Sequence, residues 1–147
     1  ARRLAAIEAL AQAGIPVGVM IAPIIPGLTD HEIPALLSAA AEAGAGFAAY
    51  TPVRLPYAVR PLFEDWLERH FPERKEKVLN RIRSMRGGKL NDPRFGTRMR
   101  GEGIFAEQIG QLFSISCRRA GIDRGRFPKL STAAFRRTGG VQPELFD

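Results

Sequence analysis

The stretch from Gly14 to Asp30, GIPVGVMIAPIIPGLTD, constrains the fold more than any other part of the chain. Its first half is an apolar run rich in β-branched residues, which predicts a strand over 15–22 that is buried on both faces, as in a parallel sheet. The prolines and Gly27 in its second half predict that the strand ends in an irregular loop. Thr29 or Asp30 is expected to cap the helix that follows. In α/β folds, ligands bind where strands deliver such loops at their carboxyl ends.

The elements around this stretch predict an α/β fold. Apolar periodicity indicates helices over 1–13 and 30–43, one before and one after the strand, and a second short strand over 47–53. Two strands joined by one helix form a βαβ unit, which implies a right-handed crossover and a parallel sheet. The same periodicity then predicts helices over 59–70, 72–85 and 103–120.

Composition limits the class of protein. With 147 residues and 45% apolar content, the chain has the size of about one globular domain. No apolar run approaches the ~20 residues that cross a bilayer, and the first residues lack the apolar core of a signal peptide. A single cysteine, Cys117, excludes an internal disulfide and fits a reducing cytoplasm. The chain begins with Ala and inside a predicted helix, so a segment is expected to precede it.

Charge is concentrated in the second half of the chain. Residues 1–80 carry a net charge of −1, and residues 81–147 carry +8, out of +7 for the whole chain. Such an excess is compatible with a polyanionic partner, and equally with a basic surface that serves solubility.

A basic, glycine-rich segment over 87–101, GGKLNDPRFGTRMRG, has no helical or strand period. Its length and charge predict a functional loop more than a plain connector. It matches no P-loop or dinucleotide-binding pattern. Arg94, Arg98 and Arg100 are its candidate contacts to phosphate.

The remaining titratable residues indicate no catalytic site. Cys117 is expected to pack as a small apolar residue, and His31 and His70 to be capping or solvated. No catalytic triad, metal motif or carboxylate pair stands out.

Three segments resemble one enzyme family: GIPVGVMIAPIIPGLTDHEIP, YTPVRLP and RGGKLNDPRFGTRMRGEG. The chain resembles the later half of radical S-adenosylmethionine (radical SAM) enzymes, and more narrowly the bacterial branch grouped with spore photoproduct lyase and labelled DNA repair photolyase. The resemblance implies the last strands of a partial (β/α)6 barrel over 1–57, a helical basic extension over 58–137 and a flexible tail over 138–147.

The resemblance also implies a cofactor site. PIIPGLTD fits the family motif GxIxGxxE, with Pro23 in place of the first glycine and Asp30 in place of the glutamate. Ile25 would lie against the adenine of SAM, and Gly27 would let the backbone approach it. Ala49 and Tyr50 match the strand that offers backbone groups to the adenine edge. An apolar shelf at the end of a strand suits a purine face.

The chain departs from the family in one respect that decides its role. Radical SAM enzymes hold a [4Fe–4S] cluster with three cysteines in CxxxCxxC, whereas this chain has one cysteine. The cluster ligands are therefore expected in a missing amino-terminal half of the barrel. This predicts a carboxyl-terminal part of a larger enzyme, of a lyase-like class, that cleaves SAM reductively and abstracts hydrogen from a substrate, and the fragment alone is expected to be inactive.

Two further interpretations stay open from the sequence. The chain could be a basic nucleic-acid-binding module without chemistry of its own, although few aromatic residues alternate with its arginines. The tail, QPELFD, is similar to the peptide that binds the bacterial sliding clamp, with Gln142, Leu145 and Phe146 as anchors.

Overall fold

The computed structural model describes residues 2–124, 129 and 131–136. In chain order its elements are α1 (Arg2–Gln12), β1 (Gly18–Ile24), the 3-10 helix η1 (Asp30–Glu32), α2 (Ile33–Glu42), β2 (Phe47–Pro52), α3 (Val59–His70), the 3-10 helix η2 (Pro72–Arg74), α4 (Lys75–Ser84), α5 (Thr97–Arg100), α6 (Ile104–Ala120) and β3 (Asp123–Arg124). The predicted α/β class is confirmed. The segment expected to be irregular over 87–101 contains the short helix α5.

The strands form one parallel sheet in the order β1-β2-β3. Since α2 joins β1 to β2, the predicted βαβ unit is confirmed. β1 starts later than the sequence predicts and continues through Pro23 to Ile24. Proline is tolerated there because the register between β1 and β2 shifts between Ile21 and Ile24, so no regular ladder bond is lost.

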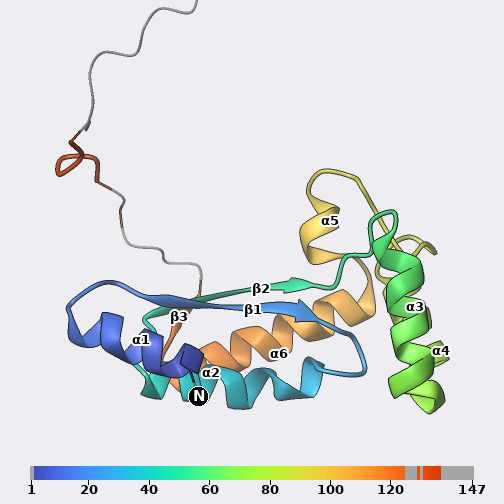
Figure 1. Ribbon diagram of the computed structural model, residues 1–147, viewed down its shortest axis with the longest axis horizontal. Coiled ribbons are helices and arrows are strands. Elements are labelled where there is room, and N and C mark those ends of the chain that lie inside the picture. Colours follow the sequence, from blue (N-terminus) through green and yellow to red (C-terminus); the bar gives the residue numbers. More distant parts are fainter. Residues whose placement is uncertain (1, 125–128, 130, 137–147) are drawn as a thin grey trace, which may run out of the picture.

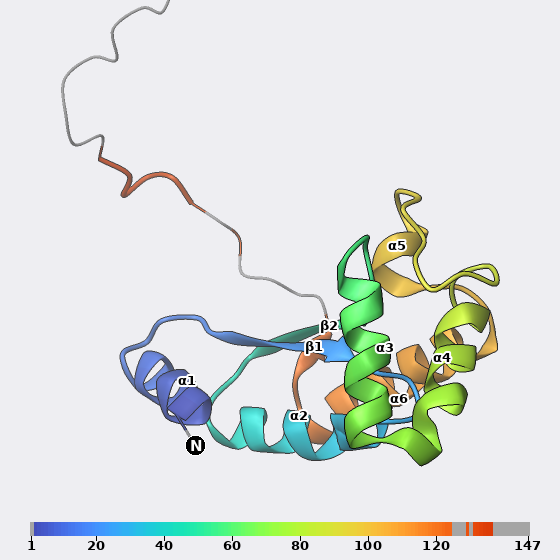
Figure 2. The ribbon, with the colours of Figure 1, turned by 45° about the vertical axis from the view of Figure 1, so that its right-hand side comes forward.

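The longer helices lie on one side of the sheet. Figures 1 and 2 show α1, α2 and α6 below the strands, and α5 above them near their carboxyl ends. Ile21 and Ala48 are buried in the core that includes α2 and α6, whereas Met20, between Val19 and Ile21, is 60% exposed. The prediction of a strand buried on both faces is therefore wrong, because no helix in the described ranges covers the second face of β1.

Two apolar clusters hold the elements together. The first lies between the sheet and helices α2 and α6, and includes the fully buried Leu37 and Phe113. The second lies where β2 ends, between α3, α4 and the loops beside them, and includes Leu55, Leu67 and Ile82. Figures 1 and 2 show α3 and α4 side by side at the carboxyl ends of the strands.

The division of the chain into 1–57 and 58–137 stays a prediction, and α6 packs across it. Ile109, Phe113 and Cys117 of α6 share the first cluster with Ile21 and Leu37. Helix α6, which belongs to the predicted basic extension, thus forms a core with the predicted barrel segment.

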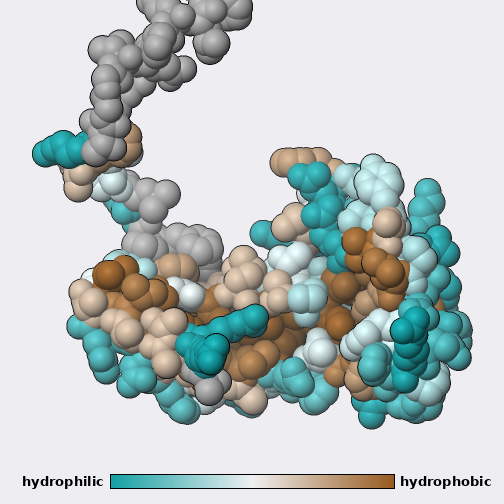
Figure 3. All heavy atoms as spheres, in the orientation of Figure 1, coloured by the Kyte–Doolittle hydropathy of each residue, from teal (hydrophilic) through white to brown (hydrophobic). Residues whose placement is uncertain are grey.

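Apolar surface is visible in the middle of the molecule, along the β1 side of the sheet, and again beside α3 (Figure 3). Among the helices that the structure describes, none combines the length and the apolar character needed to span a bilayer.

Candidate functional site

The loop that follows β1 is closed by its own polar side chains. The N–H of Ile25 donates to Oγ1 of Thr29 at 2.9 Å, and the N–H of Gly27 donates to Oδ2 of Asp30 at 2.8 Å. Neither side chain caps a helix: Thr29 makes no cap hydrogen bond to η1, and Glu32 holds the N-cap position of α2. Thr29 thus holds the predicted N-cap position, at η1, but its side chain accepts within the loop and makes no cap hydrogen bond.

Gly27 is required by its conformation and by α4. Its φ is +81°, a region that residues with a Cβ rarely adopt, and a Cβ there would lie 2.8 Å from Nη1 of Arg81. Arg81 in turn forms an ion pair with Asp30 at 3.6 Å. These contacts account for a glycine at this position, and its expected approach to adenine stays a prediction.

Ile25 lines an open, mainly apolar groove at the carboxyl ends of β1 and β2. We call this the strand-end groove; its volume is about 470 Å³, and its lining residues are Pro23, Ile25, Val53, Arg54, Leu55, Val59, Leu62, Phe63 and Trp66. Trp66 also stacks on Phe63, with ring centroids 5.8 Å apart. The walls of the groove are mainly apolar and Arg54 is the one charged side chain among the lining residues, an arrangement typical of sites for small molecules.

Ala49 and Tyr50 lie next to each other in β2, so their side chains point to opposite faces of the sheet. The Tyr50 ring packs on Phe113 of α6, with centroids 4.6 Å apart, and therefore on the helix-covered side. The structure does not bring the Tyr50 side chain into the strand-end groove with Ile25. Ala49 does not line the groove either, so the contact of these two residues with adenine stays a prediction.

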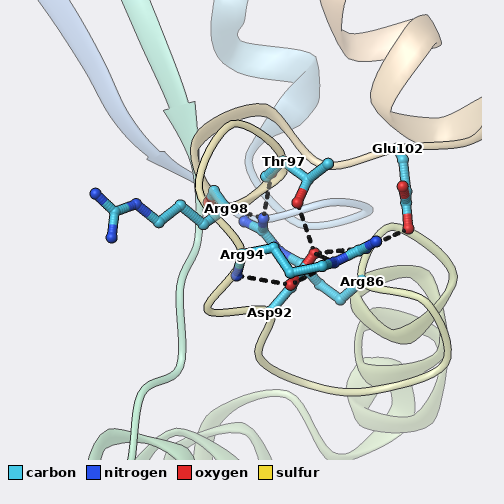
Figure 4. A network of polar contacts seen from close by, with 6 residues as sticks. All are labelled: Arg86, Asp92, Arg94, Thr97, Arg98 and Glu102. Carbon is cyan, nitrogen blue, oxygen red and sulfur yellow. Dashed lines mark hydrogen bonds and ion pairs between the residues drawn. The ribbon is translucent and has the colours of Figure 1, made fainter.

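The segment that follows α4 is held by a network of polar contacts (Figure 4). Asp92, 5% exposed, accepts hydrogen bonds from the backbone N–H of Arg94 at 3.0 Å, from its guanidinium at 2.9 to 3.2 Å, and from the Thr97 hydroxyl at 2.8 Å. The same guanidinium donates to Oε1 of Glu102 at 2.8 Å. Arg94, although 59% exposed, is thus held by two carboxylates.

Arg86 anchors this segment to the end of β2. Its guanidinium is buried and donates to three backbone carbonyls: Val53 at 3.1 Å, Thr97 at 3.1 Å and Arg98 at 2.8 Å. Burial lowers the pKa of Arg86 from its ordinary value, with Asp92 acting in the opposite sense. The loop of the predicted phosphate contacts is therefore fixed at the carboxyl end of the sheet.

Hydrogen bonds from Arg94 lower the pKa of Asp92 well below its usual range. Because this pKa is lower in the folded chain than in the unfolded one, the unfolded chain takes up the proton first as the pH falls. The stability that Asp92 provides is thus present at neutral pH and is lost as the pH falls below about 4.

We expect Asp92→Asn to destabilise the protein at pH 7, and its difference from the wild type to shrink as the pH is lowered from 5 to 3. Urea unfolding at several pH values measures this difference. Asp65→Asn is the matched control, because Asp65 is 52% exposed in an ion pair with Arg69 within α3. An equal pH dependence of the two variants would contradict the role of Asp92.

The three arginines that the sequence singled out have different surroundings. Arg94 is engaged by Asp92 and Glu102, as described above. Arg98 is partly buried, and its side chain extends away from the network (Figure 4). Arg100 is exposed and has no ion pair within the described residues.

Sequence reasoning missed Arg54 and Arg86. Arg54 directly follows the second predicted strand, a position where ligand contacts are common in parallel sheets, so its place in the chain was a usable signal. Arg86 stands at the end of a predicted helix, and only the folded chain reveals that it reaches the carbonyl of Val53, 33 residues away.

The residues of this chain do not fit a [4Fe–4S] cluster. Cys117 is its only cysteine, and it is buried in the first apolar cluster, where the sequence analysis expected it to pack. Within the described ranges, no group of three or more His, Cys, Asp or Glu side chains is arranged to hold a metal ion. The anchors predicted for a sliding clamp, Gln142, Leu145 and Phe146, lie outside the described residues.

Comparisons with protein-family models, with curated proteins and with solved structures find no match to this chain.

Proposed function

We propose that this chain is the carboxyl-terminal part of a radical SAM enzyme and supplies one wall of its SAM site. The arrangement of the sheet carries the proposal. The longer helices α1, α2 and α6 lie on one side of the parallel strands β1 and β2, as in the wall of a barrel, and the other side carries the four-residue helix α5 near the carboxyl ends of the strands. A doubly wound sheet has long helices on both sides. The uncovered face would be the barrel interior.

The strand-end groove supports a role in binding the cofactor. Ile25 lines it next to Pro23 and Val53, at the carboxyl ends of the two strands. Its side chain offers an apolar surface to adenine, while its N–H is already bonded to Thr29. SAM would supply the radical chemistry when bound; the chain's own residues would orient the adenine and exclude water from one side of it.

The test uses the complete reading frame from which this chain comes. The proposal requires the reading frame to encode the motif CxxxCxxC upstream of Ala1. A reading frame without this motif would refute the proposal. After anaerobic cluster reconstitution, we expect the whole protein to form 5′-deoxyadenosine from SAM under reducing conditions.

Ile25→Glu is expected to weaken SAM binding by about tenfold or more, because it places a carboxylate against the adenine face. Ile104→Glu is the matched control, since Ile104 is 65% exposed and lies outside the groove. Equilibrium binding of SAM to the reconstituted protein measures both. Equal affinities of the two variants would contradict the assignment of Ile25.

The alternative, a nucleic-acid-binding module without its own chemistry, is favoured by one observation. Phe95 is 91% exposed and carries the Arg98 guanidinium on one face of its ring, at 5.0 Å from the centroid. Bases stack on such exposed aromatic rings in proteins that bind single strands. This interpretation predicts an affinity for DNA that falls steeply as salt rises, and no 5′-deoxyadenosine from the complete protein.

A further inference from the structure

Two arginines beside the end of β2 have a buried polar atom without a partner. The Nε atoms of Arg54 and Arg98 are removed from solvent and make no hydrogen bond among the described residues. In the guanidinium of Arg54, the Nη1 atom lies 3.8 Å from Sδ of Met99, which is a weak acceptor. Buried N–H groups of an ionised side chain are usually hydrogen-bonded, so an acceptor is expected at this place.

Arg86 brings the two arginines into the same region. Its guanidinium binds the carbonyl of Val53, which precedes Arg54, and the carbonyl of Arg98 itself. Helix α5, which carries Arg98 and Met99, thus lies against the end of the strand that leads to Arg54. The Arg54 guanidinium reaches Met99 of the same short helix, so Arg54 and Arg98 lie at the same end of β2, while the Arg98 side chain extends away from Arg86 (Figure 4).

The nearby carboxylates are already engaged. Asp92 is bonded to Arg94 and Thr97, and Glu102 is bonded to Arg94. Within the described residues, neither Arg54 nor Arg98 forms an ion pair with an acidic side chain. Among the described residues, no carboxylate balances the positive charge of this pair.

An exposed aromatic ring adjoins the pair. The Arg98 guanidinium covers one face of Phe95, and the ring is 91% exposed. A large apolar ring that is held in solvent beside two cations can stack with a flat ligand on its free face.

We propose that Arg54 and Arg98 bind the phosphoryl group of a nucleotide, and that the base of this nucleotide stacks on Phe95. Two guanidinium groups match the charge and the several acceptor oxygens of a phosphate. Arg86 is a positioning residue that holds the backbone at Val53, next to Arg54, and at Arg98. Arg94 is occupied by Asp92 and Glu102 and is not part of the site. Arg54 also lines the strand-end groove, so this site adjoins the proposed SAM site. Arg98 and Phe95 lie outside that groove, and the proposal does not require the radical SAM assignment.

The experiment titrates the purified 147-residue chain with thymidine 5′-monophosphate, inorganic phosphate and thymidine by isothermal titration calorimetry. We expect thymidine to bind far more weakly than its monophosphate. Arg54→Gln and Arg98→Gln are each expected to raise the dissociation constant of the monophosphate about tenfold or more, because each removes charge-assisted hydrogen bonds.

Two variants control for net charge and for folding. Arg100→Gln makes the same change of charge on the same helix, and it is expected to alter the dissociation constant less than twofold. Phe95→Ala changes an exposed side chain, so it leaves the fold intact. It is expected to weaken binding of the monophosphate and to leave inorganic phosphate unaffected.

Several results would overturn the proposal: an equal effect of Arg98→Gln and Arg100→Gln, thymidine binding as tightly as its monophosphate, or no effect of Phe95→Ala. S-adenosylmethionine is titrated in the same way. If Arg54→Gln weakens the binding of S-adenosylmethionine and leaves the binding of the monophosphate unchanged, the proposal is overturned, because Arg54 would then bind the carboxylate of S-adenosylmethionine. The tetranucleotide dT4 identifies the source of the phosphoryl group. Tighter binding of dT4 than of the monophosphate supports a site for nucleic acid, and equal binding supports a site for a free nucleotide.

Discussion

Phe113→Ala is expected to lower the free energy of unfolding by about 3 to 5 kcal/mol, the range for removing a large buried aromatic side chain. Phe113 is 1% exposed and lies in the first apolar cluster, where its ring meets that of Tyr50. Alanine would leave a cavity between α6 and β2 that the close-packed surroundings fill only in part.

Urea unfolding followed by circular dichroism and by Trp66 fluorescence measures this loss. Trp66 packs against the second cluster, so the two signals report on different regions. We expect both transitions to shift together, because the Arg81 guanidinium of α4 lies over the Phe105 ring of α6, and Met85, which follows α4, belongs to the first cluster. Ile104→Ala, at a position 65% exposed on the same helix, is expected to cost less than about 1 kcal/mol. A shift of the dichroism transition alone would instead support separate units divided near residue 57.

Arg86→Met is expected to lower the free energy of unfolding by about 3 kcal/mol. Three carbonyls, those of Val53, Thr97 and Arg98, would lose a charged donor in a buried or partly buried place. Hydrogen bonds to charged groups contribute about 1.5 to 3 kcal/mol each to stability. Part of this loss is offset, because the variant no longer has the free-energy cost of burying a guanidinium. Methionine fills a similar volume, so the loss of packing is small.

Hydrogen exchange locates the effect of Arg86→Met. We expect faster exchange of amides in 94–102, with the amides of α2 unchanged. Arg83→Met is the matched control on the preceding helix, because Arg83 is 37% exposed and contacts Asn80 and Glu76 of its own helix. Protection of 94–102 equal to that of the wild type would show that Arg86 does not hold this segment.

The alternation of apolar runs, prolines and glycines was sufficient to predict the α/β class and the parallel βαβ unit. These features depend on local preferences: β-branched residues favour the strands, and glycine and proline end them. Boundaries were less well predicted, because β1 extends through Pro23 at an irregular register that only pairing with β2 reveals. The short helix α5 was missed since its four residues lie between glycines and have no period to detect.

For the candidate sites too, some features could be predicted from the sequence and others depend on the folded chain. Ile25 could be singled out from the sequence, because a proline-rich loop after an apolar strand marks the carboxyl end of a sheet. The sequence could not predict the different surroundings of Arg94 and Arg98, because both are arginines of one basic loop. Tertiary structure decided the difference: Asp92 and Glu102 engage Arg94, whereas Arg86 holds the backbone of Arg98 at the end of β2. Such bonds join residues that only the folded chain brings together, whereas the strands and helices were set by neighbours along the chain.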